Sequence, residues 1–547
     1  MSTAAARIAP AQTATVGTGL AGTGTLIRFF LRRDRITLPA WLAGLGLYVL
    51  YVGAALPTLA PEPEDLQALA PLFSQPVGRM FTGPAFGMDA PTYERLFASG
   101  YALYLFLLAA LMSILLVTRH TRLEEQSGRA ELIRANVTGR NSALTAALLV
   151  AVLANAGAFV VVAGMCLATG FAAGGSVLVG LSTALTGLAF AGIAAVTAQL
   201  SEFSRTAAGM AGIVLGAAFV LRALGDMAAV GGTALSWASP LGWAAQTAPY
   251  VHDRWAPLAL LVGLAVVTVA ASYLLLARRD FGAGAVAPRP GPPHAGRALG
   301  TPVGLAARLQ RGALLAWGAA IVAVGVVDGA FAQEMLGAAD GMPPELREMF
   351  GTQGLLDGYV AFLGKFVAIM VAAYAVYAVQ SLREEEARGR AELVLATGVG
   401  RVAWPASHAL VVAAGVVLVT AATGLGTGLA AAAVMGDGGV VGDVLISHLA
   451  TIPAPLAVLG ACVALFAWAP RLAAPVGWAL VALTGVVTVF ATLLDLPEQV
   501  QALSPLYHLS DVPVEEFAPA PFLAVTAVAA LAVAIGLAGM RRRQIGG

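Results

Sequence analysis

The sequence predicts an all-α polytopic membrane protein with twelve transmembrane helices, arranged as two parallel six-helix repeats that form a pseudo-dimer. Three observations support this prediction. Of the 547 residues, 59% are hydrophobic and only 11% are charged, which is too little polar surface for a soluble globule. The apolar residues fall in blocks of about 20, the length that spans a bilayer. A charged motif also recurs at the same place in each half of the chain.

The apolar blocks alternate with charged or Pro/Gly-rich breaks, and each block predicts one membrane span. The first half gives spans at residues 37–59, 98–118, 142–172, 174–200, 206–224 and 256–277. The second half gives spans at residues 313–334, 359–380, 403–434, 443–468, 472–493 and 519–540. Arginines precede the first span and follow the sixth and the twelfth, as expected for loops that stay in the cytoplasm. We therefore expect both termini to be cytoplasmic, and no cleaved signal peptide is indicated.

The two halves are joined by a segment rich in Pro, Gly and Arg, which predicts a flexible linker at residues 278–304. The halves are then residues 1–277 and residues 305–547. Six spans per half is an even number, so both halves enter the membrane in the same direction. Residues 26–41 alternate apolar and basic side chains, which favours a helix lying at the membrane surface, and residues 305–317 repeat this pattern weakly.

The recurring charged motif follows the second span of each half. It has the sequence EEQSGRAEL at residues 124–132 and EEARGRAEL at residues 385–393. We interpret each copy as one cytoplasmic helix ending at Gly139 or Gly400. Within it, we expect i,i+4 ion pairs of Glu125 with Arg129 and of Glu386 with Arg390.

Two features of this motif favour a docking role over a solvated loop whose arginines only fix the topology. The glutamates match between the copies, although acidic residues contribute little to topology. A glycine is unfavourable within a helix, yet one recurs as Gly128 and Gly389, which suggests close approach of another backbone. Paired helices of this kind suit a two-fold symmetric cytoplasmic partner.

With these features the sequence resembles the permease subunits of ABC transporters of the ABC-2 exporter type, in the twelve-span form found with actinobacterial antibiotic and multidrug exporters. The resemblance covers most of the chain. It implies that the two charged helices dock on a separate ABC ATPase subunit, present in two copies, and transmit its nucleotide-driven closure. The residues that carry this role over are Glu124, Glu125, Gly128, Arg129, Glu131, Leu132, Glu385, Glu386, Gly389, Arg390, Glu392 and Leu393.

The same resemblance implies a bacterial plasma-membrane exporter of amphipathic small molecules such as antibiotics or drugs. The chain is not expected to be an enzyme, because a Walker A loop needs a lysine before Ser or Thr and the only lysine, Lys365, precedes Phe366. ATP and Mg²⁺ would therefore be held by the partner subunit, with no cofactor in this chain. Cys166 and Cys462 lie in apolar blocks without metal-ligand spacing, so we expect no metal site. The charge distribution gives no indication of nucleic-acid binding.

Ionisable and aromatic residues within the spans are candidates for a substrate path. Asp328 and Lys365 are predicted to pair across adjacent helices, and Arg222 and Asp226 to pair locally. Asn155, His408, Asp443 and His448 do not form one relay by spacing. The candidate path residues are Tyr101, Tyr104, Phe106, Asp328, Lys365, Tyr374 and Tyr377. Helix packing or an interfacial position is the more common reason for aromatic residues at such places.

Two other classes of protein remain as alternatives. A proton-coupled secondary transporter of the major facilitator type also has twelve spans in parallel halves and repeats a Gly/Arg/acid motif. The long charged helix, the sizeable segments after the first and seventh spans and the interfacial helix speak against it. An intramembrane enzyme would need a constellation such as HExxH or GxSxG, which the spans lack.

Overall fold

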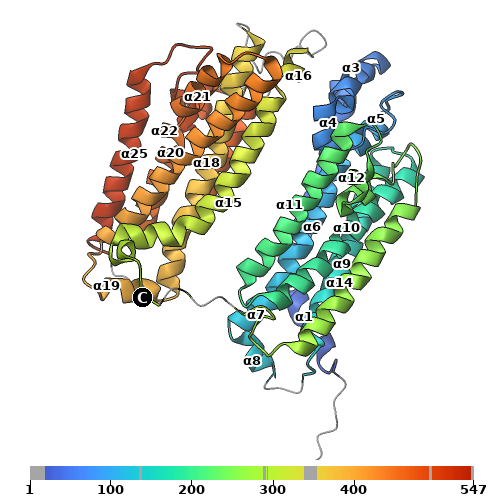
Figure 1. Cartoon of the computed structure of the whole chain (residues 1–547), viewed down its shortest axis with the longest axis horizontal. Coiled ribbons are helices and arrows are strands. Elements are labelled where there is room, and N and C mark those ends of the chain that lie inside the picture. The colour runs from blue at the N-terminus through green and yellow to red at the C-terminus, as the bar shows by residue number, and fades with distance from the viewer. Residues whose placement is uncertain are drawn as a thin grey trace, which may run out of the picture. The chain divides into compact units, whose positions relative to one another are not determined.

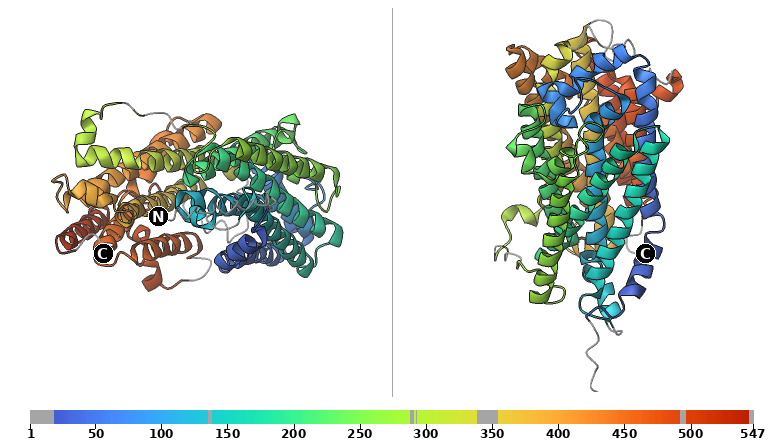
Figure 2. Two further views of the ribbon diagram at one scale, coloured as in Figure 1. Left: turned by 90° about the horizontal axis from the view of Figure 1, so that it is seen from below. Right: turned by 90° about the vertical axis from the view of Figure 1, so that its right-hand side faces the viewer.

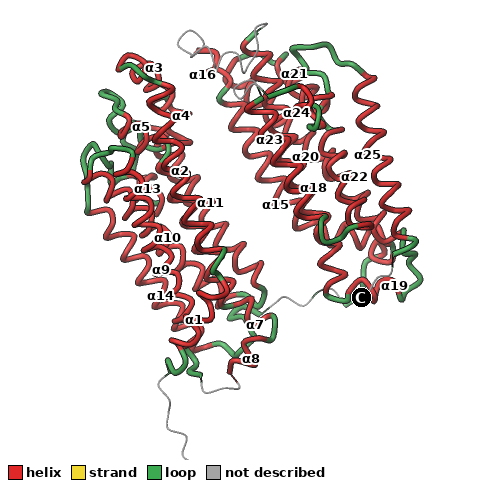
Figure 3. Tube along the Cα trace, turned by 180° about the vertical axis from the view of Figure 1, so that it is seen from behind, coloured by secondary structure: helices red, strands yellow, loops and turns green. Residues whose placement is uncertain are grey.

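The computed structural model describes residues 19–134, 138–287, 291, 293–337, 354–491 and 496–543. The chain divides into two compact units, Met1–Pro290 and Gly291–Gly547. Every regular element in the described residues is a helix (Figures 1 and 3). Within each unit the long helices run side by side as a bundle (Figure 2). The predicted all-α membrane architecture is therefore confirmed.

The first unit contains six long helices and a set of short ones. The long helices are α2 (Thr37–Leu59), α6 (Ala102–His120), α9 (Ser142–Ala168), α10 (Ala173–Leu200), α11 (Ser204–Ala228) and α14 (Ala256–Arg278). The short helices are α1 (Thr23–Arg33), α3 (Pro63–Ser74), α4 (Pro76–Thr82), α5 (Tyr93–Gly100), α7 (Arg122–Gln126), α8 (Arg129–Arg134), α12 (Ala234–Trp237) and α13 (Pro240–Ala245).

The second unit has a similar order of helices. Its long helices are α15 (Pro302–Ala330), α18 (Leu355–Ala387), α20 (Ala403–Met435), α22 (Pro453–Trp468), α23 (Ala473–Phe490) and α25 (Pro519–Met540). The shorter elements are η1 (Arg297–Gly300), α16 (Ala332–Gly337), α19 (Arg390–Leu395), α21 (Val440–Ala450), α24 (Glu498–Gln501) and η3 (Pro505–His508).

The membrane spans agree with the prediction at every position except one. Among the described residues, 11 helices are long and apolar enough to cross a membrane, and Ala473–Thr488 is a shorter apolar helix. This shorter helix lies where the sequence predicts a span at residues 472–493, of which 492–495 are outside the described residues. The structure therefore supports eleven spans plus this shorter helix.

The helices that precede the first span differ between the units. In the first unit, α1 is a separate helix that ends at Arg33, and three residues separate it from α2, which begins at Thr37. It buries Leu26 and Phe30 and leaves Arg28 and Arg32 exposed, as expected for a surface helix. In the second unit, the residues predicted as a surface helix belong to the continuous helix α15 instead.

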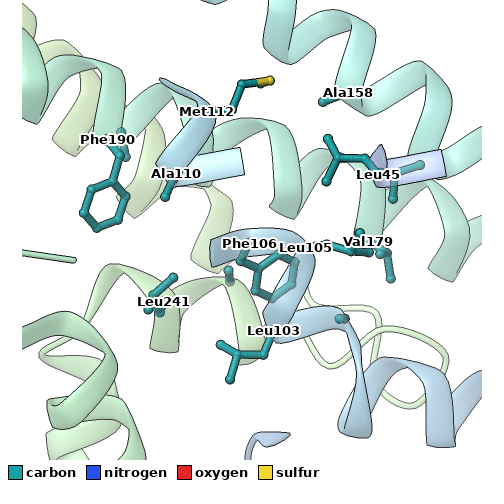
Figure 4. Close-up of a cluster of buried hydrophobic side chains, with 14 of the residues drawn as sticks. Leu45, Leu103, Leu105, Phe106, Ala110, Met112, Ala158, Val179, Phe190 and Leu241 are labelled. Carbon is teal, nitrogen blue, oxygen red and sulfur yellow. The ribbon is translucent and has the colours of Figure 1, made fainter. Parts of the chain in front are cut away.

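The core of the first unit lies between α2, α6, α9 and α10. Phe106 and Leu105 on α6 pack there with Leu45 on α2 and Val179 on α10 (Figure 4). Small residues let the helices approach closely, because a Cβ added to Gly187 would lie 1.8 Å from the Asn155 Oδ1 atom. The Asn155 side chain also donates a hydrogen bond of 2.9 Å to the Ser113 hydroxyl, which ties α9 to α6.

Equivalent helices pack against each other within each unit. In the first unit α2 contacts α9, α6 contacts α10, and α10 contacts α14. In the second unit α15 contacts α20, α18 contacts α22, and α22 contacts α25. The two units thus follow one packing plan, in which the last helix of each lies against its fourth span.

The fourth span is continuous in the first unit and interrupted in the second. Helix α10 runs without a break from Ala173 to Leu200. Its counterpart in the second unit consists of α21, which ends at Ala450, and α22, which begins at Pro453. The proline lacks an N–H, so it is tolerated in the first turn of α22 and ends the preceding helix.

Candidate functional site: the two charged segments

We call residues 122–134 the first charged segment and residues 383–395 the second charged segment. The first contains α7 and α8, and the second contains the end of α18 together with α19. Figure 1 shows each at one end of its own unit. Each directly continues the second span, so any force applied to the segment acts on that span without an intervening flexible loop.

A glycine divides each charged segment into two helices, so the prediction of one helix ending at Gly139 or Gly400 is wrong. Gly128 has φ 74° and Gly389 has φ 69°, in the left-handed region that glycine favours. The backbone N–H groups of Gly128 and Gly389 donate to the carbonyls of Glu125 and Glu386 at 3.1 and 2.9 Å. This geometry is typical of a helix end.

The recurring glycine is therefore needed for a turn of the backbone. An added Cβ at Gly128 or Gly389 would meet no described atom within 4 Å. Close approach of another part of this chain does not explain either glycine.

The turn also changes which residues form ion pairs, so the predicted i,i+4 pairs are wrong. Arg129 Nε lies 3.0 Å from Glu124 Oε2, and Arg390 Nε lies 2.9 Å from Glu385 Oε2. In both segments the first glutamate of the motif binds the arginine that follows the glycine. The hydrogen bond to Glu385, reinforced by the charges of Glu385 and Glu384, raises the pKa of Arg390 despite partial desolvation.

The second glutamate of each motif binds an arginine at the end of the last helix of its unit. Glu125 accepts hydrogen bonds from Arg279 at 2.6 and 3.0 Å, and Glu386 accepts two from Arg543 at 2.7 and 2.8 Å. Arg279 directly follows α14, and Arg543 lies three residues after the end of α25. This contact repeats in both units although its partners are far apart in sequence.

The same two arginines also contact the end of the fourth span. Arg279 Nε donates to Gln199 Oε1 at 2.7 Å, and Arg543 Nη1 donates to the Phe466 carbonyl at 2.7 Å. One guanidinium therefore links the charged segment to the ends of two further spans. From the sequence, we predicted only a topological role for these arginines. Their matched positions after the last span of each half could have indicated the shared contact.

The first charged segment is held by more contacts than the second. Arg122 is buried, donates to the Ala198 carbonyl at 2.6 and 2.9 Å, and pairs with Glu125 at 2.8 Å. Its counterpart Arg383 is exposed. Glu124 also pairs with Arg33, the last residue of α1. The first segment is thus fixed to its unit from several sides.

Each charged segment leaves part of its surface open to solvent. Arg129 and Glu131 are exposed in the first segment, and Glu392 and Leu393 in the second. Leu393 is 71% exposed. The backbone of Leu132 belongs to α8, whereas its side chain lies outside the described part of the structure.

A cavity of about 290 Å³ lies behind the first charged segment. Glu124, Glu125 and Arg279 form part of its wall, and Phe30 of α1 lies on another side. Glu124 pairs with Arg33 and Glu125 with Arg279, so ion pairs within the unit hold the segment at this wall.

The candidate path residues lie in different surroundings. In the first unit, Phe106 is buried in the core, Tyr104 is 37% exposed, and the carbonyl of Tyr101 accepts a hydrogen bond from Tyr48 at 3.0 Å. In the second unit, Tyr374 is buried, whereas Tyr377 is 40% exposed and contacts the ring of Trp317. Phe106 lines one small pocket of the first unit, and Lys365 lines another in the second unit.

Of the two predicted ion pairs in the spans, one is confirmed and one is wrong. Arg222 and Asp226 pair at 3.1 Å and are both buried. Lys365 pairs with Asp511 at 2.6 Å instead of with Asp328. Asp511 lies in the connection between the last two spans. The spacing of residues on neighbouring helices therefore does not predict this pair. One carboxylate oxygen of Asp328 is buried without a hydrogen-bond partner among the described residues.

Comparison with known proteins covers both units and both charged segments. The family model described as "Multidrug efflux system permease Rv1217c, C-terminal domain" matches residues 24–276 and 299–541. The multidrug efflux system permease protein Rv1217c of Mycobacterium tuberculosis (strain ATCC 25618 / H37Rv) is 37% identical over 538 residues, which are 97% of this chain and 96% of that protein. The chain therefore belongs to the Rv1217c family of multidrug efflux system permeases, and its identification as a permease of the ABC-2 exporter type is confirmed.

Proposed function

We propose that this protein is the membrane-spanning subunit of an ATP-driven exporter in the bacterial plasma membrane. A separate ABC ATPase subunit, bound as two copies, supplies the energy at the two charged segments. The substrates are amphipathic small molecules of the antibiotic or drug class, in keeping with the multidrug efflux role in the name of the relative. Both termini and both charged segments face the cytoplasm, where the ATPase and ATP are found.

The observation that carries this proposal is the repeated contact of Glu125 with Arg279 and of Glu386 with Arg543. Because each arginine also contacts the end of the fourth span, a displaced charged segment pulls on three spans of its unit. Two segments built in this way act as levers. A separate partner must move the charged segments, because no described part of this chain is placed to do so.

The exposed residues define the docking face more sharply than the motif does. Glu125 and Glu386 bind arginines of the permease itself, so they hold the lever in place. Glu131, Glu392 and Leu393 are exposed and remain available for the ATPase. Leu393 offers a partner an apolar contact, and Glu131 and Glu392 offer charged contacts.

The proposal is tested by co-purification of the permease with its ATPase subunit. We expect Leu393→Asp combined with Glu131→Lys and Glu392→Lys to abolish co-purification, while membrane insertion and thermal melting of the permease stay unchanged. The control is Leu503→Asp, at another largely exposed leucine in the connection before η3.

Two results would contradict the proposal. One is full retention of the ATPase by the triple variant. The other is drug transport by the lone permease in liposomes, driven by a proton gradient without ATP, which is the behaviour of a secondary transporter. Loss of transport after mutation of the Walker A lysine in the ATPase subunit would support it.

A further inference from the structure

The surface helix α1 and the turn after it carry four arginines, three of which are exposed without an ion-pair partner. Arg33 pairs with a carboxylate of α7. No carboxylate of the described residues pairs with Arg28, Arg32 or Arg35. Helix α1 itself contains no acidic residue, and the neighbouring Asp34 is only 1% exposed. The exposed side of this segment is therefore strongly positive.

The two sides of α1 have different surroundings. Leu26 and Phe30, one turn apart, are buried, and the ring of Phe30 stacks on the His120 imidazole with 4.2 Å between the centroids. Arg28 and Arg32 have the same spacing but are displaced by two residues, which places them on the opposite side of a helix. One side of α1 thus packs against its unit, and the other presents arginines to the surroundings.

Large apolar side chains are exposed beside these arginines. Phe29 is 45% exposed and Ile36 is 74% exposed. Ile36 is the residue before α2, which has the length and composition of a membrane span. The exposed side of α1 therefore lies close to the point where the chain enters the bilayer. Basic residues together with exposed aromatic and aliphatic side chains are typical of a helix at a membrane surface.

The charge of this side determines which lipid fits it. Each arginine near an anionic membrane surface strengthens binding by about fivefold, whereas a zwitterionic headgroup has no net charge to attract it. The planar guanidinium also binds a phosphate group through two parallel hydrogen bonds. Anionic phospholipid headgroups supply both the negative charge that the three arginines lack and the neighbouring acyl region for Phe29 and Ile36.

The packed side of α1 is attached to the start of the first charged segment. Asp34 Oδ2 accepts a hydrogen bond from His120 Nε2, and Asp34 Oδ1 lies 2.9 Å from Arg119 Nη1, both at the end of α6. Arg33 pairs with Glu124 in α7. Figures 1 and 3 show α1 at the same end of the first unit as α7. A helix that is held by lipid on its other side therefore restrains the charged segment.

The corresponding part of the second unit is built differently. Arg308 and Arg311 are exposed there, but they belong to α15, which continues into the membrane span without a break. A straight helix that crosses the bilayer cannot also lie along its surface. The arrangement that suits flat binding to lipid headgroups is therefore found in the first unit.

We propose that α1 binds anionic phospholipid headgroups through Arg28, Arg32 and Arg35, with Phe29 and Ile36 in the interfacial region of the bilayer, and that the bound lipid restrains the first charged segment. In the proposed orientation this is the cytoplasmic leaflet. Lipid binding does not depend on the ATPase, whereas its effect on transport rests on the proposed function.

The proposal is tested by hydrogen exchange of the full-length permease without ATPase, in nanodiscs of phosphatidylcholine with or without phosphatidylglycerol. We expect phosphatidylglycerol to slow exchange in residues 23–36 and 121–134 by about fivefold or more, equivalent to at least one arginine contact. Residues 229–255, which connect α11 to α14, should not change. Added salt should reverse the protection, because it screens exposed charges.

Two triple variants separate the charge from other properties of the side chains. Arg28→Gln with Arg32→Gln and Arg35→Gln should lose the protection by phosphatidylglycerol. Arg28→Lys with Arg32→Lys and Arg35→Lys keeps the positive charge and should retain most of it. Because these side chains are exposed and make no ion pair with the described residues, neither variant should change thermal melting in detergent.

The remaining outcomes distinguish lipid binding from docking of a protein. Equal exchange of the wild type in both lipids, or protection that persists in the glutamine variant, would overturn the proposal. Protection of residues 23–36 alone would contradict the restraint of the charged segment. If the glutamine variant loses the ATPase while the wild type shows no lipid effect, α1 is a protein-docking helix and the proposal is wrong. A lipid effect in a permease that binds no ATPase would contradict only the proposed function.

Discussion

Arg279 donates two hydrogen bonds to Glu125, at 2.6 and 3.0 Å, and thereby joins the end of the last helix of the first unit to its charged segment. Arg543 makes the same contact with Glu386 in the second unit. The two contacts differ in their surroundings, because Arg122 also binds Glu125. This difference provides a test of how each segment is held.

Charge reversal should be repaired by the reciprocal change only in the second unit. We expect Glu386→Arg to loosen the second charged segment and Arg543→Glu in the same chain to restore it, because the pair can form in the opposite sense. Glu125→Arg with Arg279→Glu should not recover, since the new arginine would face Arg122. Hydrogen exchange of residues 121–134 and 382–395 measures both outcomes. Equal recovery in the two units would contradict the structure.

Alanine at either glycine of the motif should disturb the charged segment. A left-handed backbone conformation is unfavourable by about 1–2 kcal/mol for a residue with a Cβ. We expect Gly128→Ala and Gly389→Ala to reduce ATPase stimulation by substrate and to increase hydrogen exchange in the segment. Gly400→Ala is the control, because an added Cβ there meets nothing within 4 Å and its φ is not positive. An equal effect of all three variants would argue against the turn.

The buried pair of Arg222 and Asp226 should be far more important for stability than an exposed pair. Arg222 is 0% and Asp226 is 1% exposed, and Arg222 also donates to the carbonyl of Met80 at 2.5 Å. Arg222→Met leaves a buried carboxylate without its arginine, which is unfavourable by about 3–5 kcal/mol. For the exposed Arg388, paired with Glu384, Arg388→Ala should change stability by less than about 1 kcal/mol. Thermal unfolding in detergent compares the two variants.

Acid should weaken the attachment of α1 only at low pH. The pKa of Asp34 is lowered in the folded protein, so its stabilising effect is present above the ordinary value of about 3.9 and is lost as the pH falls through the lowered pKa. The melting temperature of the wild type should therefore exceed that of Asp34→Asn from pH 8 down to about pH 4 and approach it below. A difference that already disappears at pH 5 would show that Asp34 is not held as a carboxylate.

The sequence was sufficient for the helical class, for most of the span positions and for the location of both charged segments. Apolar blocks of about 20 residues have few alternatives to a membrane span. Of the surface helix predicted at residues 26–41, residues 26–33 lie in α1, whereas residues 37–41 already belong to α2. The motif was found because its two copies preserve the same glutamates and glycine, whereas the spans around it differ.

The ion pairs within the site could not be predicted from local spacing. Glu125 and Arg129 have the spacing of a helical pair, but Gly128 turns the backbone and brings Arg129 to Glu124 instead. The contact of Glu386 with Arg543 depends on tertiary packing of α18 and α25 against α22. Asp34 and His120 were missed because one lies in a short turn and the other ends a span, where a charged group has an ordinary topological explanation.

The interruption of the fourth span between Ala450 and Pro453 means that the two halves are no longer exchangeable parts. A broken membrane helix frees backbone carbonyls that a continuous helix uses internally, and such carbonyls are potential ligands for water or a cation. In the first half, α10 has no such break between Ala173 and Leu200. A protein built from two first halves would keep both charged segments and lose this feature.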